Sequence, residues 1–156
     1  MAGQNAPTNR RSKQLTDQKL IAGLEKGFGL LVQQFKLRLL KDTGFEWYVC
    51  EGRRTIAKQD SYFAQGRTTP GKVITKAKGG QSAHNFGLAV DMVPVRKNDL
   101  WWDAPKDLWK EAADIARDIG LVPGFYFRSI FDAPHFEDPN WKVQQALWKA
   151  GKLKVA

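Results

Sequence analysis

Apolar residues recur at the three- and four-residue spacing of a helix along several stretches of the chain. The longest stretch begins at Thr16 and predicts a single helix that ends at Gly44, although three glycines weaken its middle. Further helices are indicated where Thr55 and Pro105 stand at helix-start positions. Together with the end of the chain, these signals predict helices over residues 55–64, 105–120 and 140–149.

Strand patterns separate these helices. Phe45–Val49 is aromatic and β-branched, and Leu88–Val95 is an apolar run that Pro94 is expected to close. Residues 125–136 are rich in aromatic side chains and are predicted to be extended, with a strand at Pro134–Glu137. Because helices and short strands occur without a βαβ rhythm, we expect an α+β fold with a small antiparallel sheet flanked by helices.

Length and composition predict one packed domain. The chain has 156 residues, of which 42% are hydrophobic and 26% are charged, and a chain of about 150 residues can bury one core without disulfides. We therefore expect a single domain over residues 1–156, with residues 1–14 as a flexible terminus because they are polar and aperiodic. The single cysteine, Cys50, excludes an intrachain disulfide and a thiolate zinc cluster.

The charge of the chain is strongly positive. Lys and Arg number 25 against 16 Asp and Glu, which gives a net charge of +9 and should attract polyanions such as nucleic acid, anionic lipid or an acidic cell-envelope polymer. No apolar run approaches the roughly 20 residues of a membrane-spanning helix, and the N-terminal residues lack the apolar segment of a secretory signal. We therefore expect no integral membrane segment and synthesis in the cytoplasm.

The chain has two histidines, and both stand near acidic residues. His84 precedes the predicted strand that holds Asp91, and His135 follows Asp132 by three positions. A carboxylate inside an apolar strand needs a partner, which can be an arginine, a turn or a cation. Two imidazoles and one carboxylate also form the three-ligand set of catalytic zinc, with a fourth position left for water. A turn at Gly87 would let His84 and Asp91 converge.

The segments around both histidines carry motifs of a known peptidase family. Residues 82–91 read S-x-H-x-x-G-x-A-x-D, and residues 132–135 read D-x-x-H. Together they resemble the zinc peptidases of the D-alanyl-D-alanine carboxypeptidase and VanY type, and among these the L-alanyl-D-glutamate peptidase endolysins of bacteriophages. Residues 52–59 are similar to the family's G-x-R-[ST]-x-x-x-Q, and residues 62–80 look like the stretch before its histidine motif.

The resemblance covers residues 45–138, the motif-bearing core, and implies a Hedgehog/D-Ala-D-Ala-peptidase-like fold. The family often has a Trp-Gly-rich segment before its last motif, whereas residues 121–126 here read LVPGFY. This departure affects the wall of the pocket.

The resemblance also implies how the histidine segments work. His84, Asp91 and His135 would be the zinc ligands, in agreement with the set found from the residues alone. Asp132 would be the general base that takes a proton from water. Glu137 is the rival base, and its alternative role is to support His135 from the same strand face.

Three polar residues outside the ligand set are implied as well. Arg54 would stabilise the developing oxyanion or hold the substrate. Ser82 and Gln59 would contact the substrate, with turn formation and a scaffold role as their respective alternatives. The tryptophans could form a glycan platform, but we expect most of them in the core: Trp101, Trp102, Trp109, Trp141 and Trp148.

The expected function is that of a zinc metallopeptidase that hydrolyses the peptidoglycan stem peptide, at the L-Ala–D-Glu bond, as a phage or prophage endolysin in host lysis. It would be made in the host cytoplasm without a signal peptide. As a monomer, it would act on the periplasmic cell wall after a holin has permeabilised the membrane.

Two alternatives are a D,D- or L,D-carboxypeptidase of the same family in wall remodelling, and a non-enzymatic cationic module that binds the envelope. Nucleic acid is not expected as a partner, because the basic residues are dispersed and no nucleic-acid motif is present. No separate cell-wall-binding domain is expected.

Overall fold

The computed structural model describes residues 10–156 and has two helices where the sequence predicted one. Helices α1 (Arg10–Ala22) and α2 (Lys26–Thr43) are separated by a break at Gly23. Glu25 caps α2, because its side chain accepts a hydrogen bond from the N–H of Phe28 at 2.8 Å. The single helix was therefore a wrong prediction: glycine costs a helix interior about 1 kcal/mol, and a side-chain cap follows two residues later. Gly44 ends α2 with a φ of 76°, as predicted.

Helix α1 also begins earlier than predicted, so residues 10–14 are helical and not part of a flexible terminus. Ion pairs with distant acidic residues hold this polar stretch, because Arg10 pairs with Glu46 and Lys13 pairs with Asp99. The rest of the predicted flexible terminus, residues 1–9, lies outside the described residues.

The sheet is antiparallel, as predicted, and its strand order is β1-β2-β5-β4 with β3 paired to β2. Its strands are β1 (Trp47–Glu51), β2 (Ala89–Arg96), β3 (Asp99–Leu100), β4 (Val122–Pro123) and β5 (His135–Glu137). Pro94 does not close β2, contrary to the prediction. The N–H of Val95 donates to the carbonyl of Glu46, so the preceding residue directs its nitrogen away from β1, where a proline is tolerated.

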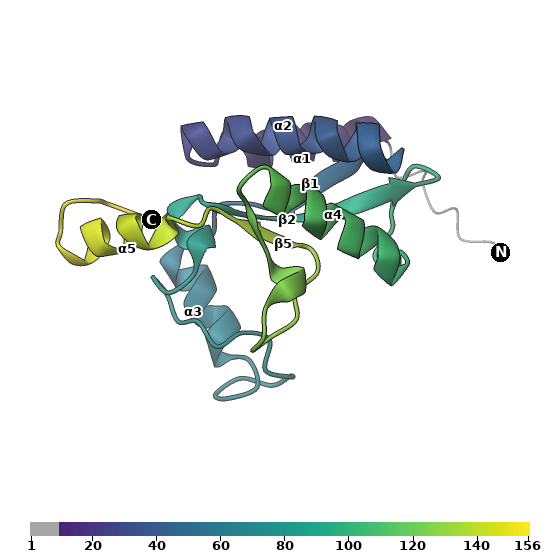
Figure 1. The fold of residues 1–156 in the computed structure, drawn as a ribbon. Coiled ribbons are helices and arrows are strands. Elements are labelled where there is room, and N and C mark those ends of the chain that lie inside the picture. The colour runs from purple at the N-terminus through teal and green to yellow at the C-terminus, as the bar shows by residue number, and fades with distance from the viewer. Residues whose placement is uncertain (1–9) are drawn as a thin grey trace.

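One face of the sheet packs against α2 and α4 (Lys106–Asp118) to form the core. Phe136 of β5 is fully buried and meets Phe35 of α2 edge to face, with ring centroids 4.9 Å apart. Trp47 of β1 meets Trp109 of α4 in the same way at 5.3 Å. Figure 1 shows α2 above the sheet and α3 below it. The face of the sheet opposite the core is therefore the face toward α3.

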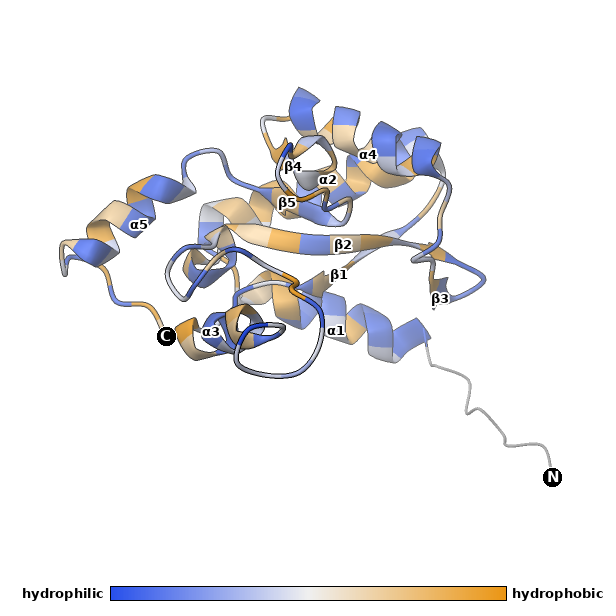
Figure 2. Cartoon of the chain, turned by 90° about the horizontal axis from the view of Figure 1, so that it is seen from below, coloured by the Kyte–Doolittle hydropathy of each residue, from blue (hydrophilic) through white to orange (hydrophobic). Residues whose placement is uncertain are grey.

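The opposite face carries polar residues within apolar strands. Side chains alternate along β2, so Asp91 points away from the core face that Val90 and Met92 occupy. Figure 2 shows β2 as a hydrophobic strand with a hydrophilic break. This face is bordered by α3 (Ile56–Ala64), the short helices η1 (Ala83–Phe86) and η2 (Gly124–Tyr126), and α5 (Trp141–Lys149).

The predictions for α3 and α5 are confirmed, with Thr55 capping α3 by accepting from the N–H of Lys58. Phe125 and Tyr126 were predicted to be extended but lie in η2, where the Gly124 carbonyl accepts hydrogen bonds from the N–H groups of Phe127 and Asp132.

The tryptophans follow the core prediction with one exception. Trp109 is buried, and Trp141 and Trp148 pack around Phe86. Trp102 is 58% exposed, because it lies in a turn after β3. Within residues 10–156, no helix combines the length and the apolar character needed to cross a membrane.

Candidate metal centre

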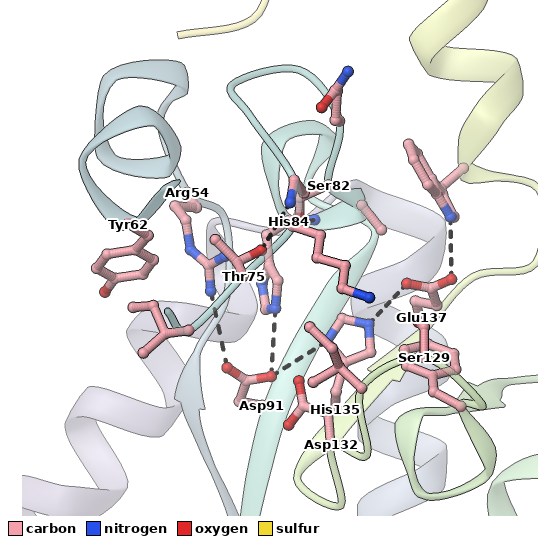
Figure 3. Close-up of a pocket in the computed structure, with 18 residues that line it drawn as sticks. Arg54, Tyr62, Thr75, Ser82, His84, Asp91, Ser129, Asp132, His135 and Glu137 are labelled. Atoms are coloured by element: carbon pink, nitrogen blue, oxygen red, sulfur yellow. Dashed lines mark hydrogen bonds and ion pairs between the residues drawn. The ribbon is translucent and has the colours of Figure 1, made fainter. Parts of the chain in front are cut away.

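His84, Asp91 and His135 meet on the face of the sheet opposite the core (Figure 3). Asp91 and His135 are direct partners in the β2–β5 ladder, and His84 comes from η1. Oδ1 of Asp91 lies 3.3 Å from Nε2 of His84 and 3.4 Å from Nδ1 of His135. The candidate ligand atoms of the three residues all lie within 4.8 Å of one another. The structure therefore brings together the three residues predicted as ligands.

Gly87 makes the turn that joins η1 to β2, as the sequence predicted. It has a φ of 69°, a left-handed conformation that favours glycine. A Cβ at this position would lie 2.5 Å from Nη2 of Arg53 and 2.9 Å from the backbone nitrogen of Glu25. Glycine is therefore required here both for the conformation and for the space.

Each histidine is oriented by a second partner. Nδ1 of His84 lies 2.7 Å from the carbonyl oxygen of Gly52, to which it donates, and this leaves Nε2 facing Asp91. Nε2 of His135 lies 2.7 Å from Oε2 of Glu137, which leaves Nδ1 toward Asp91. The other oxygen of Glu137 accepts from Nε1 of Trp141 at 3.1 Å. Metal-ligating histidines typically donate their second N–H to a carbonyl or carboxylate in this way.

The electrostatics of the site favour a cation. Oδ1 of Asp91 is buried and is the one side-chain atom of residues 10–156 identified as buried without a hydrogen-bond partner. Burial alone would raise the pKa of Asp91, but His135 and His84 outweigh it and hold that pKa well below its usual range. Burial would lower the pKa of His135, whereas Asp91 and Glu137 raise it to about 9. A buried carboxylate oxygen between two imidazole nitrogens fits a zinc ion.

Asp132 lines the same cleft as the three candidate ligands. The turn before β5 places it there, since the N–H of Asp132 donates to the Gly124 carbonyl and the N–H of His135 donates to the Asp132 carbonyl. Burial, followed by the negative charge of Asp91, raises the pKa of the Asp132 carboxyl group. A carboxylate with a raised pKa is suited to accept and return a proton.

Arg54 lies beside the ligands and is held on several sides. Nε donates to Glu51 and Nη1 donates to Gln59, both at 2.8 Å, while Nη2 is 4.0 Å from Oδ2 of Asp91. The guanidinium also lies over the ring of Tyr62, 4.8 Å from its centroid. The sequence had left an arginine open as the partner of Asp91. Arg54 is such an arginine, but it faces Oδ2 of Asp91 and not the buried Oδ1.

Gln59 lies behind Arg54 and does not line the cleft. Its side chain is fully buried, and its Nε2 donates to the carbonyl of Ala77 at 2.8 Å. This placement corresponds to the scaffold alternative. Ser82 does line the cleft, and its Oγ accepts from the N–H of His84 at 3.4 Å at the start of η1.

The cleft has a volume of about 470 Å³. Tyr62, Thr75 and Lys76 line it from α3 and the following loop, and Ser129 and Ile130 line it from the segment before β5. Sequence reasoning did not assign Tyr62 or Trp141 to the site. The spacing of four residues between Glu137 and Trp141 indicates a contact between them only when the turn into α5 is known.

The sequence is similar to that of known peptidases. Residues 75–138 match the model of the D-alanyl-D-alanine carboxypeptidase family. The chain is 35% identical over 102 residues to the peptidoglycan L-alanyl-D-glutamate endopeptidase CwlK of Bacillus subtilis (strain 168). This match covers 60% of the chain and 61% of CwlK, so the chain spans about three fifths of that relative's length.

Solved structures have the same fold. The L-Ala D-Glu endopeptidase ChiX of Serratia marcescens superimposes with a TM-score of 0.57 at 20% identity, covering 81% of this chain and 89% of ChiX. The D,D-pentapeptidase VanY, solved in complex with Zn(II), gives a TM-score of 0.53 at 17% identity, covering 82% and 79%. The predicted D-Ala-D-Ala-peptidase-like fold and the predicted resemblance to this peptidase family are therefore confirmed.

Proposed function

We propose that this protein is a zinc-dependent peptidase of the D-alanyl-D-alanine carboxypeptidase and VanY type, and that it hydrolyses the stem peptide of peptidoglycan between L-Ala and D-Glu. The observation that carries the proposal is the unpartnered, buried Oδ1 of Asp91 between two imidazole nitrogens, in a segment that matches the family. The choice of bond is supported by the similarity to CwlK, which is an L-alanyl-D-glutamate endopeptidase.

The zinc ion would be held by Nε2 of His84, a carboxylate oxygen of Asp91 and Nδ1 of His135. These are the atoms left facing one another once Gly52 and Glu137 have taken the other ring nitrogens. When bound, zinc supplies Lewis-acid chemistry: it polarises a peptide carbonyl and lowers the pKa of water. Gly52 and Glu137 keep the two rings in the required tautomers and orientations.

We assign the proton transfer to Asp132. Its carboxyl group lines the cleft and has a raised pKa, so it can take a proton from the attacking water and pass it to the leaving amine. Glu137 is less suited to that role, because one of its oxygens accepts from His135 and the other accepts from Trp141. Glu137 instead orients His135.

Arg54 would hold the carbonyl oxygen of the scissile bond as negative charge develops on it. Glu51 and Gln59 fix two of its nitrogens, which leaves Nη2 toward Asp91 and the cleft. Gln59 is thus a positioning residue that acts through Arg54. Ser82, at the rim beside His84, is the remaining candidate for a hydrogen bond to substrate.

Digestion of purified peptidoglycan followed by mass spectrometry tests the proposal. We expect fragments with a new N-terminal D-Glu. Release of terminal D-Ala would instead identify a carboxypeptidase, which the family match to D-alanyl-D-alanine carboxypeptidase makes the second candidate. Intact peptidoglycan in the presence of zinc would contradict both.

The biological role we propose is that of a phage endolysin that reaches the wall with the help of a holin. This role is supported by the resemblance of the histidine motifs to the endolysin peptidases. Expression of the chain in a bacterial cytoplasm should be tolerated until the membrane is permeabilised, and lysis should then follow within minutes. Equal survival of cells that express wild-type protein or Asp132→Asn after permeabilisation would contradict this role.

A further inference from the structure

The positive charge of the chain is concentrated in two segments. Residues 52–81 contain seven Lys and Arg against one acid, Asp60, and residues 141–156 contain four Lys and no acid. Together these segments carry a net charge of +10, which exceeds the +9 of the whole chain. All other residues contain 14 Lys and Arg against 15 Asp and Glu, a net charge of −1. The basic residues are spread along the sequence, but their excess over acidic residues is confined to these two segments.

The two segments lie against each other in the fold. The N–H of Ile56, at the start of α3, donates to the carbonyl of Ala156 at 2.8 Å, and Nε2 of Gln145 in α5 donates to the carbonyl of Gly80 at 2.7 Å. Figure 1 shows α3 below the sheet and the chain returning from α5 toward α3. We call the exposed side chains of residues 52–81 and 141–156 the basic surface.

The cations of the basic surface are not used to hold the fold together by ion pairs. Ten of the eleven Lys and Arg side chains in the two segments are exposed and belong to this surface, whereas Arg54 is withdrawn into the cleft. Apart from Arg54, the Lys and Arg side chains of residues 10–156 for which the structure gives an ion pair with a carboxylate lie elsewhere: the exposed Arg10 and Lys110, and the half-buried Lys13, Lys36 and Arg38. Unpaired charges on one surface repel one another, so their concentration points to an anionic partner.

The basic surface is continuous with the candidate active site. Lys76 is exposed on this surface and also lines the cleft, and Tyr62 lies beneath Arg54 and Lys58 at 4.8 and 4.9 Å from its ring centroid. A polyanion bound to the basic surface would therefore lie next to the candidate ligands. The stem peptide itself is anionic, since the proposed bond has D-Glu on one side.

We propose that the basic surface binds the carboxylates of the peptidoglycan sacculus and holds the cleft against the wall. The inference rests on the proposed function, because it takes the substrate polymer as the partner. Many weak, screened contacts to neighbouring stem peptides would keep the protein on the wall between cleavage events. The surface would thus attach the catalytic domain itself to the wall.

Sedimentation with purified sacculi tests the inference, with all variants in the Asp132→Asn background so that binding is read without cleavage. The first variant carries Lys149→Glu, Lys152→Glu and Lys154→Glu, three exposed positions of the basic surface outside the cleft. The matched control carries the same change at exposed lysines elsewhere: Lys19, Lys41 and Lys106. Both sets alter the net charge equally, so only the position of the charge differs.

We expect the first variant to bind sacculi about tenfold more weakly than its parent at about 0.05 M salt, and the control to change by less than about twofold. The difference should vanish at about 0.5 M salt, where screening shortens the reach of surface charges to a few ångströms. Equal weakening of both variants, or of neither, would overturn the inference. Thermal melts check that both variants are folded.

A second measurement needs no substitution in the basic surface. Sacculi whose carboxylates have been converted to amides should lose binding of the parent protein about tenfold, and unchanged binding would overturn the inference. Tighter binding of duplex DNA or of phosphatidylglycerol vesicles than of sacculi at equal salt would also overturn it. Failure of the proposed function would appear separately, as wild-type protein that binds sacculi but does not cleave soluble muropeptides.

Discussion

Replacing Asp132 and Glu137 one at a time separates the proton carrier from the residue that supports the metal site. Both carboxylates line the cleft, but only Glu137 has its oxygens engaged, by Nε2 of His135 at 2.7 Å and by Nε1 of Trp141 at 3.1 Å. Asp132→Asn keeps the size of the side chain and removes its ability to accept a proton. Glu137→Gln keeps the size and removes the negative charge that orients His135.

The two variants should fail in different ways. For Asp132→Asn we expect kcat to fall about 10²- to 10⁴-fold, the usual contribution of a general base, which corresponds to about 2.7–5.4 kcal/mol in the activation barrier. Zinc affinity should stay nearly unchanged. For Glu137→Gln we expect zinc affinity to fall about 10- to 100-fold, as for other partners of metal-ligating histidines, with kcat largely restored at saturating zinc.

Zinc titration against a competing chelator gives the affinities, and cleavage of a soluble muropeptide gives kcat at saturating zinc. Ser129→Ala, in the same cleft but without a role in the proposal, serves as the control. The reverse pattern, with kcat lost in Glu137→Gln and retained in Asp132→Asn, would refute the assignment of the base. Full activity in both variants would refute the use of either carboxylate.

Three further predictions concern the metal, the scaffold and the cysteine. Chelation of zinc should abolish cleavage and lower the melting temperature by about 10 °C, because an ion present at about 1,000 times its Kd stabilises the fold by about 4 kcal/mol. An unchanged melting temperature together with unchanged activity would contradict the zinc site. Gln59→Leu should lower the free energy of unfolding by about 2–4 kcal/mol in urea titrations, because it removes hydrogen bonds to Arg54 and Ala77 in a fully buried position. The control Gln33→Leu, at an exposed position of α2, should change the free energy of unfolding by less than about 0.5 kcal/mol. Burial raises the pKa of the Cys50 thiol to about 12, and the negative charges of Asp91 and Asp17 add to this effect. Iodoacetamide at about pH 8 should therefore alkylate Cys50 at least about 100-fold more slowly than a free cysteine peptide. Comparable alkylation rates would contradict the raised pKa.

The elements predicted correctly from the sequence are those specified by neighbouring residues. Thr55 predicts the start of α3 because its hydroxyl caps the helix that immediately follows it. Gly44 predicts the end of α2 because only a few residue types adopt its left-handed φ readily. The candidate ligands were recognisable because Asp91 is a charge inside an apolar strand, and because the chain has only His84 and His135 as imidazole donors.

The features that sequence reasoning missed depend on distant partners. The early start of α1 depends on Glu46 and Asp99, which pair with its basic residues from other elements. The continuation of β2 through Pro94 depends on the direction of its nitrogen, which is turned away from the ladder with β1. The preference that we propose for Asp132 over Glu137 as the base depends on the contact between Trp141 and Glu137, and periodicity contains no information about that contact.

The pairing of Asp91 with His135 across β2 and β5 has a consequence for folding. A slip of one residue in this ladder would turn His135 to the face now occupied by Phe136 and would separate the candidate ligands. A bound ion would therefore act as a check on strand register, since only the native alignment presents both donors to it. Because β5 joins β2 across 38 residues of intervening chain, residues 97–134, we expect metal to slow unfolding more than it accelerates folding.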